Sequence, residues 1–158
     1  PLSPSEITLA LTLASCTRGF VICVVSILVF SFFVELNFHS FFVIIIYAFF
    51  SSFILGSIGI IVGLWAEKFD HMASATNFII VPLSFLSGTF YSVERLPDFL
   101  REVSEINPFF YMIDGFRYGF LGVSDGSLFF GCIFLVLLSF LSWFSAYILF
   151  KKGYKIKS

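Results

Sequence analysis

Four long apolar segments dominate the hydrophobic pattern of this 158-residue chain. A helix rises about 1.5 Å per residue, so roughly 20 apolar residues cross the hydrocarbon core of a bilayer. Lipid cannot form hydrogen bonds with backbone N–H and C=O groups, so each segment must form these bonds within itself. Each segment is therefore predicted to be a helix. The predicted spans are residues 16–34, 40–65, 73–91 and 127–150.

The four spans differ in their polar content. The second and fourth carry no charge, and the first carries only Arg18, close to its predicted start, where the side chain could snorkel toward the interface. The third is uncharged but contains Pro82, which removes one helix hydrogen bond and predicts a kink or a break. Together the segments predict an all-α integral membrane protein.

Short polar links join the first three spans, at residues 35–39 and 66–72. Ahead of the first span, Ser3 or Ser5 is expected to cap a helix that has Glu6 in its first turn. The semi-polar stretch that follows, residues 7–15, is expected to lie at the membrane interface.

The long connection between the third and fourth spans predicts two short external helices within residues 95–122. Apolar residues recur at helical spacing up to Ile106, Asn107-Pro108 ends that helix, and a second helical run follows. Both helices are too short to cross a bilayer, so they are expected to lie on the outer leaflet or dip into it. Asp114 and Arg117, three residues apart, could pair with each other or bind a substrate head group.

Composition and charge agree with a membrane location. The chain is 59% hydrophobic and 12% charged, whereas a soluble domain carries about 25% charged residues. Four spans place six basic residues on the side of the two chain ends and three on the other, so both ends are predicted to be cytoplasmic, in the inner membrane. The six are Arg18, Lys68, Lys151, Lys152, Lys155 and Lys157, and the three are Arg95, Arg101 and Arg117. The chain begins with Pro1 rather than Met, so it is expected to be part of a longer chain with further spans.

Small and polar residues mark two of the spans for a special role. In the second span, Gly56, Gly59 and Gly63 would let another helix approach closely, within one subunit or across a dimer. The third span is predicted either to line a transport pathway or to be a kinked packing helix whose hydroxyls bond to its own backbone. The pathway candidates in this span are Asn77, Pro82, Ser87 and Gly88.

The external region carries a recognisable pattern of residues. The segments PLSFLSGTFY (82–91), Leu96-Pro97, NPFFYMIDGFRYG (107–119) and Leu121-Gly122 strongly resemble the pattern of ABC-2 permeases, the membrane subunits of type V ABC exporters. The resemblance covers the whole chain, 1–158, as a single transmembrane domain holding the last four of six spans. The external motif residues are Asn107, Pro108, Tyr111, Asp114 and Arg117.

That resemblance implies a permease that exports a lipid, polysaccharide, drug or similar cargo and works as a dimer, here expected to be a homodimer. ATP and Mg would be bound by a separate ATP-binding subunit, since this chain has no phosphate-binding loop and no expected cofactor. Membrane lipids are expected partners and nucleic acid is not. The ATPase-coupling loop would hold Glu67, Lys68, Phe69 and Asp70.

Three other classes of protein compete with this interpretation. An intramembrane enzyme needs grouped acids or histidines, but His39 and His71 are predicted to lie on opposite sides of the bilayer, about 30 Å apart. A channel or secondary transporter usually places ionisable groups at the membrane midplane, and the predicted span cores lack them. A membrane scaffold would leave the external pattern unexplained. The three cysteines form no metal-binding or disulfide pattern.

Overall fold

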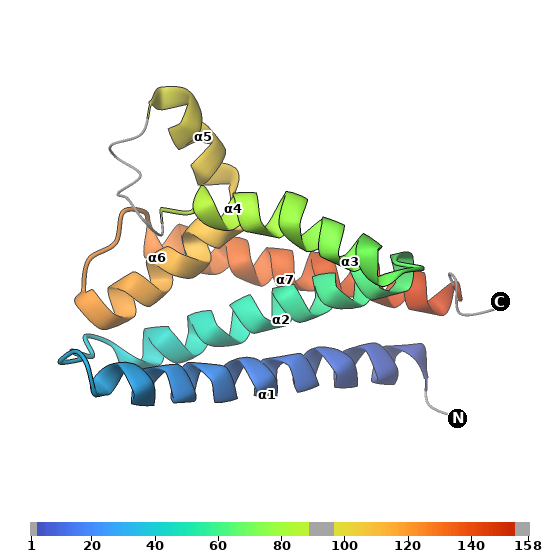
Figure 1. Cartoon of the computed structure of the whole chain (residues 1–158), viewed down its shortest axis with the longest axis horizontal. Helices are drawn as coiled ribbons and strands as arrows, with labels where there is room; N and C mark the ends of the chain where they lie inside the picture. Colours follow the sequence, from blue (N-terminus) through green and yellow to red (C-terminus); the bar gives the residue numbers. More distant parts are fainter. Residues whose placement is uncertain (1–2, 89–96, 154–158) are drawn as a thin grey trace.

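The computed structural model of the chain describes residues 3–88 and 97–153, and these residues form helices joined by short turns (Figure 1). No strand occurs in the described ranges, which confirms the all-α prediction. The helices are α1 (Pro4–Ser31), α2 (Phe41–Trp65), α3 (Phe69–Ala75), the π-helix η1 (Thr76–Ile80), α4 (Val81–Phe85), α5 (Asp98–Ile106), α6 (Pro108–Leu121) and α7 (Leu128–Lys151).

The helix α2 is the centre of the arrangement, because it packs against α1, α6 and α7. The two chain ends lie at one end of the bundle, and α5, α6 and the turn between α1 and α2 lie at the other (Figure 1). A buried core joins α2, α6 and α7 through residues that include Tyr47, Ile54, Tyr111 and Leu135. Many large apolar side chains remain exposed on the long helices, as expected of surfaces that lipid solvates.

The start of α1 follows the capping pattern that the sequence predicts. The Ser3 hydroxyl accepts a hydrogen bond from the Glu6 amide at 3.3 Å, and the Glu6 carboxylate accepts one from the Ser3 amide at 2.7 Å. From this cap the helix continues without a break for 28 residues, about 42 Å. The stretch 7–15 is therefore helical and continuous with the residues that follow, and its interfacial location stays a prediction.

Contacts between α1 and α2 fix the position of Arg18 relative to α2. A Cβ added at Gly19 would lie 2.1 Å from the Ser52 hydroxyl, and one at Gly56 would lie 2.6 Å from Ser15 Cβ. The two helices are antiparallel, so Arg18 lies level with Ser52, in the middle of α2. The helix that contains the predicted first span begins at Pro4 rather than at residue 16, so Arg18 lies in the middle of α1, while the bounds of the span itself stay a prediction.

The predicted third span is a broken helical run. It begins with α3 at Phe69, continues through η1 and α4, and turns at residues 86–88, while residues 89–91 lie outside the described residues. Within the described part of the chain, α1, α2 and α7 are long and apolar enough to cross a membrane. The fourth crossing stays a prediction.

The break in this run has a local cause in Pro82. The Val81 amide donates to the Thr76 carbonyl five residues back, which is π-helical geometry. Pro82 has no amide hydrogen, so the turn that precedes it cannot continue the regular α-helical ladder. The Ser84 hydroxyl donates to the Ile80 carbonyl at 2.9 Å, four residues back, which adds a second local perturbation.

Candidate functional site

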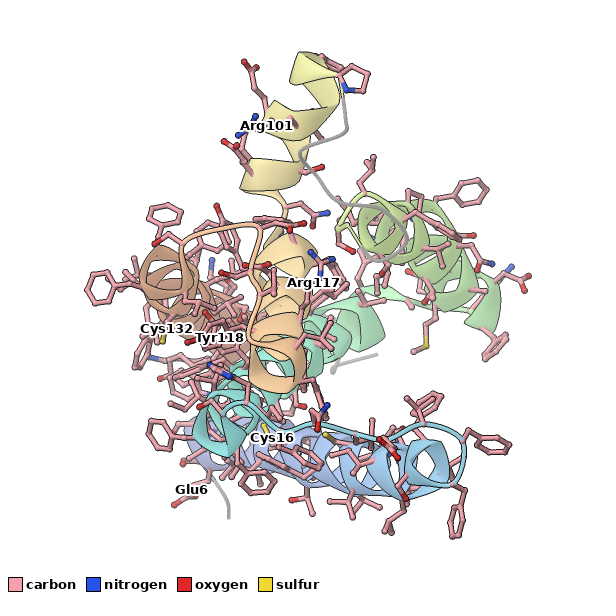
Figure 2. The ribbon with its side chains drawn as sticks, turned by 90° about the vertical axis from the view of Figure 1, so that its left-hand side faces the viewer. Glu6, Cys16, Arg101, Arg117, Tyr118 and Cys132 are labelled. Carbon is pink, nitrogen blue, oxygen red and sulfur yellow. The ribbon has the colours of Figure 1, made fainter. Side chains whose placement is uncertain are left out.

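The residues of the external motif gather where the end of α4, the helices α5 and α6, and the start of α7 meet. Figure 2 shows Arg117 on the side of α6 that faces α4. Three motif residues and two neighbours outside the motif fasten three separate segments to one another, and we call these five side chains the external clamp. It consists of Ser104, Asn107, Asp114, Arg117 and Asp125.

Three clamp side chains bond to backbone carbonyls at the end of the α4 segment. The last carbonyls of a helix have no partner within the helix, so they need donors from elsewhere. Asn107 Nδ2 donates to the Leu83 carbonyl at 2.6 Å, and the Ser104 hydroxyl donates to the Leu86 carbonyl at 2.8 Å. Arg117 Nη2 donates to the Gly88 carbonyl at 2.6 Å, placing a positive charge at the negative end of a helix.

Asn107 also determines where α6 begins. Its Oδ1 accepts a hydrogen bond from the Phe109 amide at 3.0 Å, so the residue caps α6 while its amide nitrogen holds α4. Pro108 occupies the first helical position, where no amide hydrogen is needed. The side chain of Asn107 is 2% exposed, so the two bonds are made away from water.

Asp114 fastens α6 to the segment that leads into α7. Its Oδ1 accepts from the Asp125 amide at 2.7 Å and its Oδ2 from the Gly126 amide at 3.2 Å. A Cβ at Gly126 would lie 3.1 Å from the Phe110 ring and 3.4 Å from Asp114 Oδ2, so glycine allows this close approach. Burial raises the pKa of Asp114, and the amides of Asp125 and Gly126 and the nearby Arg117 oppose that rise.

Arg117 completes the clamp by joining its two halves. Its Nη1 pairs with Asp125 Oδ2 at 2.5 Å while Nη2 holds the Gly88 carbonyl. The pairing of Arg117 with Asp114 that the sequence suggests does not form, because Asp114 turns both its oxygens toward the backbone of residues 125–126. The loop thus supplies the acid that pairs with Arg117.

Two tyrosines brace the clamp from below. The Tyr111 hydroxyl donates to the Glu105 carbonyl at 2.7 Å, and the Tyr47 hydroxyl donates to the Leu128 carbonyl at 2.8 Å. Gly115 lets α6 lie directly on the Tyr47 ring, since a Cβ there would fall 2.0 Å from a ring carbon. The motif residues therefore serve mainly to position segments. Asp114 is 3% exposed, and both of its oxygens already accept hydrogen bonds from backbone amides.

The predicted coupling loop lies at the opposite end of the bundle. The connection proper is only residues 66–68, because α3 starts at Phe69 and takes Asp70 into its first turn. The Phe69 side chain is 82% exposed and that of Trp65 is 49% exposed. The Trp65 ring lies 5.5 Å from the His71 ring, so an aromatic surface with adjacent charges forms at this end.

The predicted pathway residues do not share one surface. Asn77 in η1 is exposed, whereas Ser87 and Gly88 are buried under the clamp. The Ser87 hydroxyl donates to the Ser84 carbonyl, and Gly88 has the positive φ of 76° that ends the run. These bonds favour the packing alternative for the last turn and leave Asn77 and Pro82 as the exposed pathway candidates.

The glycines of α2 are used differently from one another. Gly56 lies against Ser15 of α1, but no described atom lies within 4 Å of a Cβ placed at Gly59 or Gly63. The close helix contacts that were not predicted from the sequence are at Gly19, Gly115 and Gly119, where an added Cβ would fall 2.1, 2.0 and 2.4 Å from a neighbouring side chain. Gly115 and Gly119 are four residues apart, the same spacing as Gly59 and Gly63, so this spacing was an available signal for the contact with α2.

Comparison with known proteins gives an independent line of evidence. Residues 1–121 match the model of the ABC-2 type transporter family. The chain is 34% identical over 125 residues to the inner membrane transport permease YadH of Escherichia coli K12, which covers 78% of this chain and 49% of YadH. It is 31% identical over 90 residues to nodulation protein J of Neorhizobium galegae, which covers 54% of this chain and 34% of that protein.

The chain thus spans about half the length of YadH. No solved structure matches it. The family model extends over the broken helical run, both external helices and every motif residue of the clamp from Asn107 to Arg117. On this match, and on the agreement with YadH, the chain belongs to the ABC-2 type transporter family.

Proposed function

We propose that the chain is part of the permease subunit of an ATP-driven exporter, situated in the inner membrane with both chain ends in the cytoplasm. The observation that carries the proposal is the family match over residues 1–121, which includes the complete external motif. Relatives with names such as inner membrane transport permease support the same location and the same general activity. The energy would come from ATP, with Mg, in a separate subunit.

The excess of basic residues at the end that carries both termini supports a cytoplasmic assignment for that end. The aromatic surface of Trp65 and Phe69 lies at the same end and is exposed in this chain. Exposed aromatic side chains flanked by charges are typical of protein interfaces. We therefore assign the contact with the ATP-binding subunit to Glu67, Lys68, Phe69 and Asp70.

A second copy of the permease is the proposed partner within the membrane. The run from α3 to α4 makes few contacts with the rest of the chain, and Gly59 and Gly63 face open space. Small residues on an uncovered helix face favour close packing with another helix in lipid. These surfaces would be covered by the second copy and by the remainder of the polypeptide.

Co-purification tests the coupling assignment. The complete permease is expressed with the ATP-binding protein encoded beside it, as wild type and with Glu67, Lys68 and Asp70 changed to Ala. The matched control changes Arg101 and Glu105, which pair at 3.4 Å on the opposite end of the molecule, to Ala. We expect the ATPase to remain with wild type and control and to be lost from the triple variant.

Two results would contradict the proposal in different ways. A folded wild-type permease that retains no ATPase would refute the partner-driven mechanism. Retention of the ATPase by the triple variant would refute only the contact at residues 66–72.

A further inference from the structure

Arg18 is a charged side chain in the middle of α1, a helix long and apolar enough to cross a membrane, where such helices rarely carry a charge. It is exposed on α1 and lies level with the middle of α2, which has no charge along its whole length. A cation that faced the hydrocarbon at this depth would be strongly unfavourable, so intramembrane arginines face a partner, a polar cavity or a transport path. The flank of α1 that carries Arg18 is therefore not a simple lipid surface.

The described part of the chain supplies no acid to neutralise Arg18. The ion pairs among the described residues join Arg101 with Glu105 and Arg117 with Asp125, and neither pair includes Arg18. The run from α3 to α4 makes no contact with α1 that could cover this flank. The positive charge is thus available to a group from outside the described residues.

An apolar groove adjoins Arg18 on the side of the external helices. It has a volume of about 460 Å³ and lies between α1 and α6, which do not pack against each other. Gly19, Ile22, Ser26 and Phe30 line its α1 wall, and Phe116 and Phe120 line its α6 wall. The wall from Gly19 to Phe30 extends about 16 Å along the helix. Ile22 follows Arg18 by four residues, so the two side chains lie on the same face of α1 one turn apart, and Gly19 at the inner end of the groove directly follows Arg18.

We propose that Arg18 and this groove form a binding site for an anionic amphiphile. The guanidinium would bind the phosphate or carboxylate through paired hydrogen bonds, and the groove would hold the acyl chain. The geometry suits a molecule that comes from the cytoplasmic leaflet. The acyl chain of such a molecule points from the cytoplasmic surface toward the external end. When its head group moves up to Arg18, its acyl chain therefore enters the groove. This inference deepens the proposed export function by assigning a class of cargo.

Binding of dodecyl phosphate to the complete permease in a nonionic detergent tests the site, with uncharged dodecyl glucoside as the matched probe. Native mass spectrometry counts the bound molecules and gives the dissociation constants. We expect Arg18→Gln to weaken dodecyl phosphate binding by at least about tenfold and to leave dodecyl glucoside unchanged, since only the charged bond is removed. Arg101→Gln, a change at an exposed external arginine, should leave both constants as in wild type.

A second variant keeps the proposal falsifiable if Arg18→Gln does not fold. Ile22→Trp fills the groove and leaves the charge in place, so it should weaken both probes, whereas Arg18→Lys should weaken only the phosphate and by less than Gln does. Unchanged binding of dodecyl phosphate in folded Arg18→Gln would overturn the role of the charge. Unchanged binding of both probes in Ile22→Trp would overturn the groove.

The source of the natural ligand is distinguished by the lipids that co-purify from native membranes. A stoichiometric anionic phospholipid, present with wild type and lost with Arg18→Gln, would identify a resident membrane lipid. A wild-type site that is filled only by added amphiphile would indicate exported cargo. Both readouts are independent of ATPase association, so failure of the coupling experiment and failure of this binding site are separable.

Discussion

At the end that holds the external clamp, Asn107, Asp114 and the half-buried Arg117 bond to two carbonyls and two amides of neighbouring segments, whereas the opposite end exposes Trp65 and Phe69. The same long helices run between the two ends, so the difference between the ends does not come from the helices themselves. At the external end the chain satisfies its own polar groups, and at the other it presents side chains to something else. In a transporter this arrangement suits a fixed cap at one end and a docking surface at the other.

The difference shows that a strong sequence motif need not mark a site of chemistry. The motif residues Asn107, Asp114 and Arg117 belong to the most recognisable part of the chain, yet each one bonds to backbone groups of a neighbouring segment or to Asp125. Buried polar networks of this kind stabilise one arrangement strongly, because every broken bond leaves an unpaired group. Single substitutions should therefore affect the two ends very differently.

The largest effect is expected for Asp114→Ala. It leaves the partly buried amides of Asp125 and Gly126 without an acceptor, so the free energy of unfolding should fall by about 3 kcal/mol. The matched change at the other end, Asp70→Ala, should cost less than about 0.5 kcal/mol. Thermal unfolding of both variants in detergent measures the contrast. Equal losses of unfolding free energy in the two variants would show that side-chain bonds at the clamp end stabilise the fold no more than those at the opposite end.

Gly115→Ala should have the next largest effect, about 2 kcal/mol, because the new methyl group would overlap the Tyr47 ring. Gly59→Ala adds the same atom where no described atom lies within 4 Å, so the isolated permease should keep its stability. Denaturant titrations of the two variants compare them directly. A loss of stability at Gly59 as large as that at Gly115 would show that a partner helix already covers Gly59.

Arg117→Lys keeps the positive charge in the clamp but removes the guanidinium group, whose two nitrogens bond to different partners. A lysine cannot hold Asp125 and the Gly88 carbonyl with two separately directed nitrogens, so about 1 to 1.5 kcal/mol should be lost. Protease sensitivity of the loop at residues 122–127, compared with that of Arg101→Lys, reports the loosening. Wild-type resistance in Arg117→Lys would mean that charge alone is sufficient.

Ser3→Ala gives the smallest expected effect and tests the end that carries the termini. It removes the hydroxyl that caps α1, and caps of this kind contribute about 1 kcal/mol. Hydrogen exchange should show faster exchange in the first turn of α1 and no change in the clamp. Faster exchange at Asp125 would instead show that the two ends are energetically coupled through α1 and α7.

Much of the fold follows from the hydrophobic pattern. The apolar runs predict α2 and α7 within two residues of their observed ends, and Asn107-Pro108 correctly separates α5 from α6. These elements are set by local rules, namely the length of an apolar run and the residues that cap it.

The start of α1 shows where such rules stop. The apolar run begins at residue 16, whereas the helix begins at Pro4, and Thr8 and Thr12 within it are buried and bond to carbonyls of their own helix. Threonines four residues apart, each able to bond one turn back, were the available signal. The partners of Asp114 were beyond sequence reasoning, because they are backbone amides of a loop whose path only the tertiary packing determines.

The π-helical turn at Thr76–Ile80 acts as a phase shift within the run from α3 to α4. Each α-helical residue advances by about 100° around the axis, so one extra residue rotates everything after the turn by about that angle. Asn77 and Ser84, which a continuous α-helix would place on one face, are thereby set apart. If the π-helical turn moved along the run, the residues that it passed would rotate about the helix axis by this fixed angle, while both ends stayed helical.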